Sequence, residues 1–299
     1  MTSGTIVRLL AAIGLWAACF PLVTIGLDLA PHLAFAAARA ALAGLCLLAL
    51  GALLGRRVPK GPRVWGWIVL VALGATSLGF LGMFHAAEFV SPGLATVIYN
   101  GQPLLAAILG HTLLRERLGA RGKTGLLLGL VGIIAIAWPG LVPGGTGGYA
   151  LGMGYLFIAA AGEAVGNVAM KRLPGEIDAM LAMGWQLLLG AVPLALGAVW
   201  TEDFSSVTRS PKFLGVLLVL SVFGTALPFW LWFGALKQVE LNKANAFRFL
   251  LPLLGLVIGA AFFKERVSWL QGAGVVVTLL GIALVQREGS ARATGAHPP

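Results

Sequence analysis

The stretch Tyr99-Asn100-Gly101-Gln102-Pro103 interrupts an apolar segment that runs from Pro92 to Leu114. Pro103 cannot donate a helix hydrogen bond, so the carbonyl of Tyr99, four residues back, loses its usual partner. Asn100 and Gln102 are costly in lipid unless they face a protein partner or a cavity. The stretch therefore predicts an interrupted helix near the centre of a membrane protein.

The amino-acid composition assigns the chain to the integral membrane proteins. Of its 299 residues, 59% are hydrophobic and only 11% are charged, whereas about a quarter are charged in a soluble domain. The net charge of +10 comes from basic residues in short loops between apolar segments, a pattern that sets membrane orientation and does not indicate nucleic-acid binding. Cys19 and Cys46 both lie inside apolar segments, which argues against a disulfide framework or a zinc site. We expect an all-α polytopic membrane protein without a cofactor or a metal site.

Ten apolar segments approach or exceed the length of about 20 residues that a membrane-spanning helix needs. They are Ile6–Leu27, Leu33–Leu54, Val64–Ala87, Pro92–Leu114, Lys123–Pro139, Ala150–Met170, Ala179–Val199, Phe213–Leu236, Leu241–Phe263 and Trp269–Val285. We expect the first segment to be retained rather than cleaved as a signal peptide, because its counterpart in the second half cannot be a signal.

The positions of the 21 Lys and Arg residues predict the orientation in the membrane. With the N-terminus inside the cell, the outer loops contain only Arg209, Lys212, Lys264 and Arg266. Arg39 and Arg248 lie within helices, and the remaining fifteen fall on the inner side. Both termini are therefore predicted to be cytoplasmic.

The two halves of the chain repeat one pattern at a constant offset of 149 residues. The matched pairs include Pro103 with Pro252, Gly110 with Gly259, Glu116 with Glu265, Gly125 with Gly274, and Gly132 with Gly281. A repeat of five helices, an odd number, must enter the membrane from the opposite side the second time. We expect two inverted five-helix repeats, residues 1–143 and 144–287, followed by a disordered tail, residues 288–299. The alternative is chance similarity between apolar segments, which the matched Pro, Gly and Glu disfavour.

The doubled order of Pro, Gly, Glu and two Gly seven residues apart resembles that of the drug/metabolite transporter superfamily, in particular its EamA-type permeases. The resemblance implies ten helices in a five-plus-five arrangement that exports small metabolites, and it is strongest to bacterial aromatic amino-acid exporters. These motif residues mark the fold and do not identify the substrate.

Polar and aromatic residues inside the apolar segments predict a central cavity. The candidate substrate-binding residues are Trp16, Arg39, Phe84, His85, Tyr99, Asn100, Gln102, Glu163, Trp185, Phe247 and Arg248, and the candidate hinges are Gly101, Pro103 and Pro252. An apolar cavity with few polar contacts suits large neutral or aromatic groups.

The charged candidates each allow two interpretations. Arg39 could pair with a substrate carboxylate, or it could be a gate or packing residue bonded to backbone carbonyls. Arg248 could bind a substrate anion, or it could pair permanently with Glu163. Glu163 could also carry a proton, since burial raises the pKa of a carboxyl group and a nearby Arg lowers it.

Two further interpretations concern the ends of the helices. His85 and Glu88 are three residues apart, which predicts that they share a helix face as a proton relay or lie separately at the membrane interface. Trp230, Trp232 and Trp269 are expected to face lipid as interfacial aromatic residues.

These features predict a monomeric transporter of the bacterial inner (plasma) membrane that exports amphipathic metabolites, including aromatic amino acids, by alternating access. A dimer is the alternative oligomeric state. Another exporter activity within the family, such as for drugs or nucleotide sugars, is one rival function. A membrane enzyme acting on lipid phosphates is the second rival, and a scramblase or structural subunit is a third that no motif supports. The Gly122-Lys123-Thr124 tripeptide does not complete a phosphate-binding loop, and we expect no catalytic residues.

Overall fold

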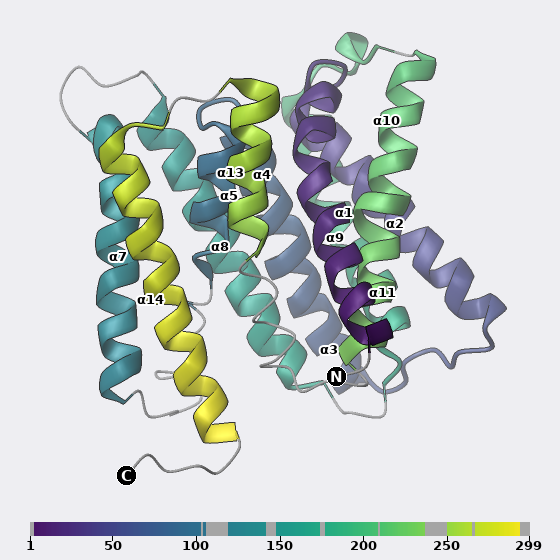
Figure 1. Ribbon diagram of the computed structural model, residues 1–299. Helices are drawn as coiled ribbons and strands as arrows, with labels where there is room; N and C mark the ends of the chain where they lie inside the picture. The colour runs from purple at the N-terminus through teal and green to yellow at the C-terminus, as the bar shows by residue number, and fades with distance from the viewer. Residues whose placement is uncertain are drawn as a thin grey trace.

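The computed structural model describes residues 3–102, 104–105, 119–141, 148–173, 177–208, 210–236, 250–264 and 267–293. Within these ranges the chain forms helices joined by short turns, and no strand occurs among them (Figure 1). Pro103, Phe247 and Arg248 lie outside the described residues, and only the backbone of Pro252 is described. The all-helical prediction is confirmed for the described chain.

The helices of the first half are α1 (Ser3–Leu27), α2 (His32–Leu53), α3 (Pro62–Val71), η1 (Ala72–Leu78), α4 (Gly79–Ala86), α5 (Pro92–Tyr99) and α7 (Ala120–Leu141). Those of the second half are α8 (Tyr149–Lys171), α9 (Ala179–Thr201), η2 (Phe204–Ser206), α10 (Pro211–Ser221), η3 (Val222–Ala226), α11 (Leu227–Leu236), α13 (Leu250–Phe263) and α14 (Trp269–Ala293). In Figure 1, α1 begins and α14 ends at the same, lower end of the bundle.

Six helices of the described chain are long and apolar enough to cross a membrane. They are Ser3–Leu27, His32–Leu53, Pro62–Ala86, Tyr149–Met170, Met180–Thr201 and Pro211–Trp232. A shorter apolar helix covers Trp269–Leu284. Each begins and ends within a few residues of a predicted segment, because the apolar pattern marks both the helix and the lipid-facing length.

The interruption predicted at Tyr99–Pro103 is present on the described residues. Helix α5 ends at Tyr99, and the Gly101 amide turns back to donate to the carbonyl of Ile98 at 3.0 Å. The Asn100 side chain donates to the Thr96 carbonyl at 2.8 Å, so its cost in the apolar surroundings is met locally. Gln102 follows the turn and is buried.

The helices associate in closely packed pairs, which small residues make possible. Helix α2 packs against α9, α7 against α14, α5 against α13, α1 against α11, and α4 with η1 against α8. A Cβ atom on Gly44 would come within 2.8 Å of the Gly184 carbonyl oxygen, so the backbones of α2 and α9 almost touch. Such close approach is typical of helices that pack in lipid, where van der Waals contact drives association.

Two spanning helices contain a widened, π-helical turn that the sequence did not predict. Segment η3 corresponds, at the offset of 149, to residues 73–77 within η1. In each, a side-chain hydroxyl bonds a carbonyl five residues back: Ser77 to Ala72 at 3.3 Å and Thr225 to Leu220 at 3.2 Å. A π-turn shifts the angular phase of every residue that follows it, and such turns often mark functional sites.

Candidate functional site

Arg39 lies in α2, seven residues after its first residue, His32, which is about 10 Å along the helix axis. The residue is only 5% exposed. Its Nε donates to the Thr225 hydroxyl at 3.2 Å, and the Ser221 hydroxyl donates to its backbone carbonyl at 3.3 Å. The helix that contains η3 therefore holds both the backbone and the side chain of Arg39.

Aromatic rings and a thiol complete the surroundings of the guanidinium group. Its central carbon lies 5.4 Å from the Phe80 ring centre and 5.8 Å from that of Phe84, within the range of cation–π attraction. The Cys19 thiol donates to the Leu15 carbonyl at 3.1 Å and also reaches the Gly224 carbonyl. Among the described residues, the ionisable groups close enough to act on the charge of Arg39 are Cys19 and Tyr99, and neither is a carboxylate.

One nitrogen of the Arg39 guanidinium group, Nη1, is buried and has no hydrogen-bond partner. An unpaired donor of a charged group in a protein interior costs more than a neutral one, because the desolvation is not repaid. Phe84 and Tyr99 were predicted to share a site with Arg39, and the structure brings these three together. Thr225, Phe80 and Cys19 join them from η3, α4 and α1, respectively.

A second polar contact occupies the corresponding place in the other half. Thr76, the counterpart of Thr225 at the offset of 149, donates to Gln186 Oε1 at 2.6 Å. Gln186 is buried and lies seven residues after the start of α9, as Arg39 does in α2. The neighbouring Ser77 hydroxyl donates to the Gly190 carbonyl at 2.9 Å. This contact is neutral, whereas the contact of Arg39 with Thr225 carries a positive charge.

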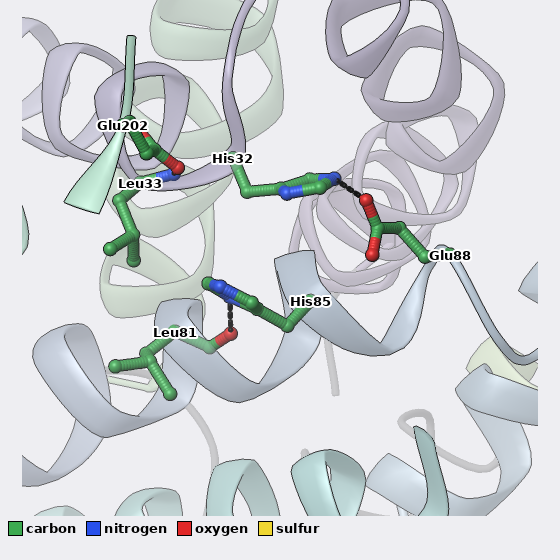
Figure 2. Close-up of polar contacts among 6 residues, drawn as sticks. All are labelled: His32, Leu33, Leu81, His85, Glu88 and Glu202. Carbon is green, nitrogen blue, oxygen red and sulfur yellow. Dashed lines mark hydrogen bonds and ion pairs between the residues drawn. The ribbon is translucent and has the colours of Figure 1, made fainter. Parts of the chain in front are cut away.

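The end of the bundle where α2 begins, which we name the His32 end, carries a cluster of histidines and acids. His32 Nε2 lies 3.0 Å from a Glu88 carboxylate oxygen, and Figure 2 shows the His32 ring reaching from α2 to that carboxylate. The His85 ring lies 5.2 Å from that of His32 and 5.0 Å from that of Tyr155. Its Nδ1 is 2.9 Å from the Leu81 carbonyl (Figure 2). The contacts tie α2, α4 and the turn after α4 together.

Glu202 binds the same end of α2 from the end of α9. Its carboxylate accepts the amide hydrogen of Leu33 at 2.7 Å (Figure 2) and that of Ala34 at 2.8 Å. Pro31, at the N-cap position, offers no side-chain cap, so a residue distant in sequence supplies it. The adjacent Asp203 folds the following turn: hydrogen bonds from the Ser205 hydroxyl and amide hold the pKa of its carboxyl group below the ordinary value.

The other predicted site residues are distributed over several contacts. Trp16 packs against Phe229, with ring centres 5.6 Å apart. Trp185 packs against Trp65 at 5.1 Å, and its indole Nε1 is buried without a hydrogen-bond partner. Glu163 is half-buried in α8, and its predicted pairing with Arg248 lies outside the described residues.

Two predictions about helix ends are corrected. Glu88 does not form its described ion pair with His85 but with His32, because α4 ends at Ala86 and the helical three-residue spacing no longer applies at position 88. Trp232 was expected to face lipid, yet it is 6% exposed and lies 5.5 Å from the Trp16 ring. Trp230 and Trp232 stand two residues apart in α11 and therefore point to nearly opposite sides of the helix, and Trp230 is the exposed one.

Sequence reasoning did not select His32, Glu202, Thr225, Thr76 or Gln186. A signal existed for three of them, since Thr76 and Thr225 match at the offset of 149 and Gln186 is an amide inside an apolar segment. His32 and Glu202 stand at helix ends, where polar residues are common, so they carried no comparable signal.

Comparison with known proteins places this arrangement in a family. The sequence pattern of the EamA-like transporter family matches residues 2–138 and again residues 150–287. A WAT1-related chloroplastic protein of Arabidopsis thaliana is 33% identical over 251 residues, and this chain spans 60% of its length. A probable amino-acid metabolite efflux pump of Salmonella typhimurium is 25% identical over 287 residues, which cover 91% of each protein.

A solved structure supports the fold independently of close sequence similarity. It is a crystal structure with 21% sequence identity and a TM-score of 0.66, and the match covers 98% of this chain and 99% of the other. The likeness extends over the whole helical bundle and shows a shared fold. The doubled family match and the apolar helices lead to one conclusion: the chain belongs to the EamA-like transporter family and is a multi-pass transporter of the inner (plasma) membrane.

Proposed function

We propose that the chain exports small amphipathic metabolites, amino acids including aromatic ones among them. The observation that carries this proposal is the set of polar groups around Arg39, deep in the bundle and surrounded by Phe80 and Phe84. A few polar groups in aromatic surroundings suit a solute with a polar head and an apolar side chain. The likeness to a relative named as an amino-acid metabolite efflux pump supports the same class of solute.

We further propose ten membrane helices in two inverted repeats, with both termini in the cytoplasm, the His32 end outside and the protein acting as a monomer. The doubled family match supports the repeat, and so does the pairing of helices. The pairs α2 with α9 and α7 with α14 each join counterparts of the two halves, and α5 with α13 joins parts of the counterpart segments 92–114 and 241–263. The pair α1 with α11 likewise corresponds to α8 with α4, as a two-fold axis in the membrane plane requires.

Alternating access is the proposed mechanism. Backbone contacts such as that between Gly44 and Gly184 favour movement of α2 and α9 as one unit. Bending would occur where the helical hydrogen bonds are irregular, at the turn after Tyr99 and at η1 and η3. Gly101, Pro103 and Pro252 remain the proposed hinge residues.

The cluster at the His32 end would act as the outer closure. The pair of His32 with Glu88 joins α2 to the turn after α4, so these elements cannot separate while it holds. Opening this end would break the pair, whereas the contacts of Glu202 with α2 would move with the α2–α9 unit.

Transport by reconstituted protein tests the proposal. Proteoliposomes loaded with unlabelled phenylalanine should accumulate labelled phenylalanine by counterflow, and the rate should saturate with concentration. Absence of saturable flux for every amino acid tried would reject this class of solute. Flux of a drug or nucleotide sugar instead would favour another exporter of the family, and turnover of a lipid phosphate that stops on metal chelation would favour the enzyme.

A further inference from the structure

We infer that the Arg39 guanidinium group binds the carboxylate of the transported solute. This inference rests on the proposed function and names the chemical group that the site recognises. The first observation concerns the positive charge of Arg39. Within the described ranges the ion pairs are His32 with Glu88 and Arg56 with Asp178, and Arg39 takes part in neither.

A buried cation without a counter-ion is expensive, because its hydration is lost and no opposite charge repays the loss. Arg39 recovers part of this cost through one hydrogen bond to Thr225 and through the faces of Phe80 and Phe84. Its Nη1 recovers none. A carboxylate on the solute would supply the missing counter-ion and hydrogen-bond acceptor. The same carboxylate would leave the site with the solute.

The geometry of the group favours a carboxylate. Thr225 fixes Nε, and the two aromatic rings restrict the plane of the guanidinium, so the orientation of the remaining nitrogens is set before binding. The two oxygens of a planar carboxylate match the spacing of the guanidinium N–H donors, and donors that are already oriented lose little entropy on binding. Within the described core Arg39 is the buried cation, and a phosphate dianion would need more positive charge than one guanidinium supplies.

The other half of the molecule shows that the fold itself does not need this charge. There Thr76, the counterpart of Thr225, bonds Gln186 through a neutral amide; Gln186 is also buried and stands two residues before Leu188, the counterpart of Arg39 at the offset of 149. In both places a serine hydroxyl of one helix also donates to a carbonyl of the facing helix: Ser77 in η1 to Gly190, and Ser221 at the end of α10 to Arg39. A neutral side chain can therefore make this kind of helix contact, and recognition of an anion explains why Arg39 is charged.

Substitution of Arg39 separates recognition from packing. In Arg39→Gln the uncompensated charge is gone, so the thermal unfolding temperature of the solute-free protein should stay the same or rise. The stabilisation that saturating phenylalanine gives to the unsubstituted protein should disappear. Arg39→Lys keeps the charge without the fork and should retain a reduced response. Arg56→Gln makes the same chemical change at an exposed position in the loop after α2 and should leave the response intact.

Solute selectivity gives a second readout. The unsubstituted protein should take phenylalanine in preference to phenylalaninamide, which lacks only the negative charge. In Arg39→Gln the KM for phenylalanine should rise roughly ten- to a hundred-fold, the loss expected for a charged hydrogen bond, while that for the amide changes little. Unchanged selectivity in a variant that still transports would overturn the inference and leave the proposed function standing. A lower unfolding temperature of Arg39→Gln with unchanged selectivity would show that Arg39 has a packing role. Absence of flux in the unsubstituted protein would instead reject the proposed function.

Discussion

Thr76 and Thr225 stand 149 residues apart and make equivalent contacts from equivalent π-turns. The Thr76 hydroxyl donates to Gln186 at 2.6 Å, and the Thr225 hydroxyl accepts from Arg39 at 3.2 Å. The direction of the hydrogen bond differs because an amide oxygen accepts and a guanidinium only donates. One architecture thus supports a neutral contact in one half and a charged one in the other.

Removal of these two hydroxyls should have different consequences. Thr225→Val leaves Arg39 charged but less well oriented, so the KM for phenylalanine should rise roughly fivefold, equivalent to about 1 kcal/mol. Thr76→Val leaves the buried Gln186 oxygen without its donor and should cost about 1–3 kcal/mol of stability with little change in KM. Proteoliposome kinetics and unfolding of both variants in detergent measure the two effects. Equal effects of both substitutions on KM would contradict the assignment.

The close contact between α2 and α9 should not tolerate even a methyl group at Gly44. Its Cβ would lie 2.8 Å from the Gly184 oxygen and 2.9 Å from the Leu188 nitrogen, both backbone atoms that cannot turn aside. Gly44→Ala should therefore destabilise the protein by about 1–3 kcal/mol. Gly66→Ala is the matched control, since no atom lies within 4 Å of its Cβ position. Thermal unfolding in detergent compares the variants, and equal midpoints would refute the rigid contact.

The outer closure should respond to pH through His32. Protonation makes its contact with Glu88 a full ion pair, which stabilises the closed His32 end, while His85 and Glu202 face the same ring and modulate the charge. Acidification of that side to pH values below about 6.5 should slow transport, by no more than about fivefold for a partly exposed pair. Flux measured against external pH tests this. His32→Gln and Glu88→Gln should flatten the profile, and Asp28→Asn, an exposed carboxylate at the same end, should not.

The cap that Glu202 supplies to α2 should contribute to stability. Glu202→Ala leaves the amide groups of Leu33 and Ala34 without their acceptor and should lower the free energy of unfolding by about 1–2 kcal/mol. Asp203→Ala is the control, because that carboxylate bonds only within its own exposed turn. Equal unfolding midpoints for the two variants in detergent would show that the cap has no such role.

Much of the fold could be predicted from local sequence, and the candidate site only in part. The break after Tyr99 follows from Asn, Gly and Pro chemistry that acts within one helical turn, and α5 does end there. Arg39 stood out because an intramembrane charge is rare. The sequence allowed His85 and Glu88 to share a helix face or to lie separately at the interface; α4 ends at Ala86, and Glu88 pairs with His32, which the spacing could not indicate. Trp232 was expected to face lipid together with Trp230, but residues two apart in a helix point to nearly opposite sides, and only Trp230 of this pair is exposed.

The sequence by itself determined what depends on composition and on near neighbours: a membrane-spanning helical chain, the doubled pattern at an offset of 149, and the helix break beside Pro103. Apolar length and proline chemistry act locally, so they can be read without coordinates. Only the tertiary structure decided that Arg39 meets Thr225, Phe80 and Phe84, and that its Nη1 has no partner. These contacts join residues as far apart as 186 positions, and they depend on how helices pair and on where a π-turn shifts their phase.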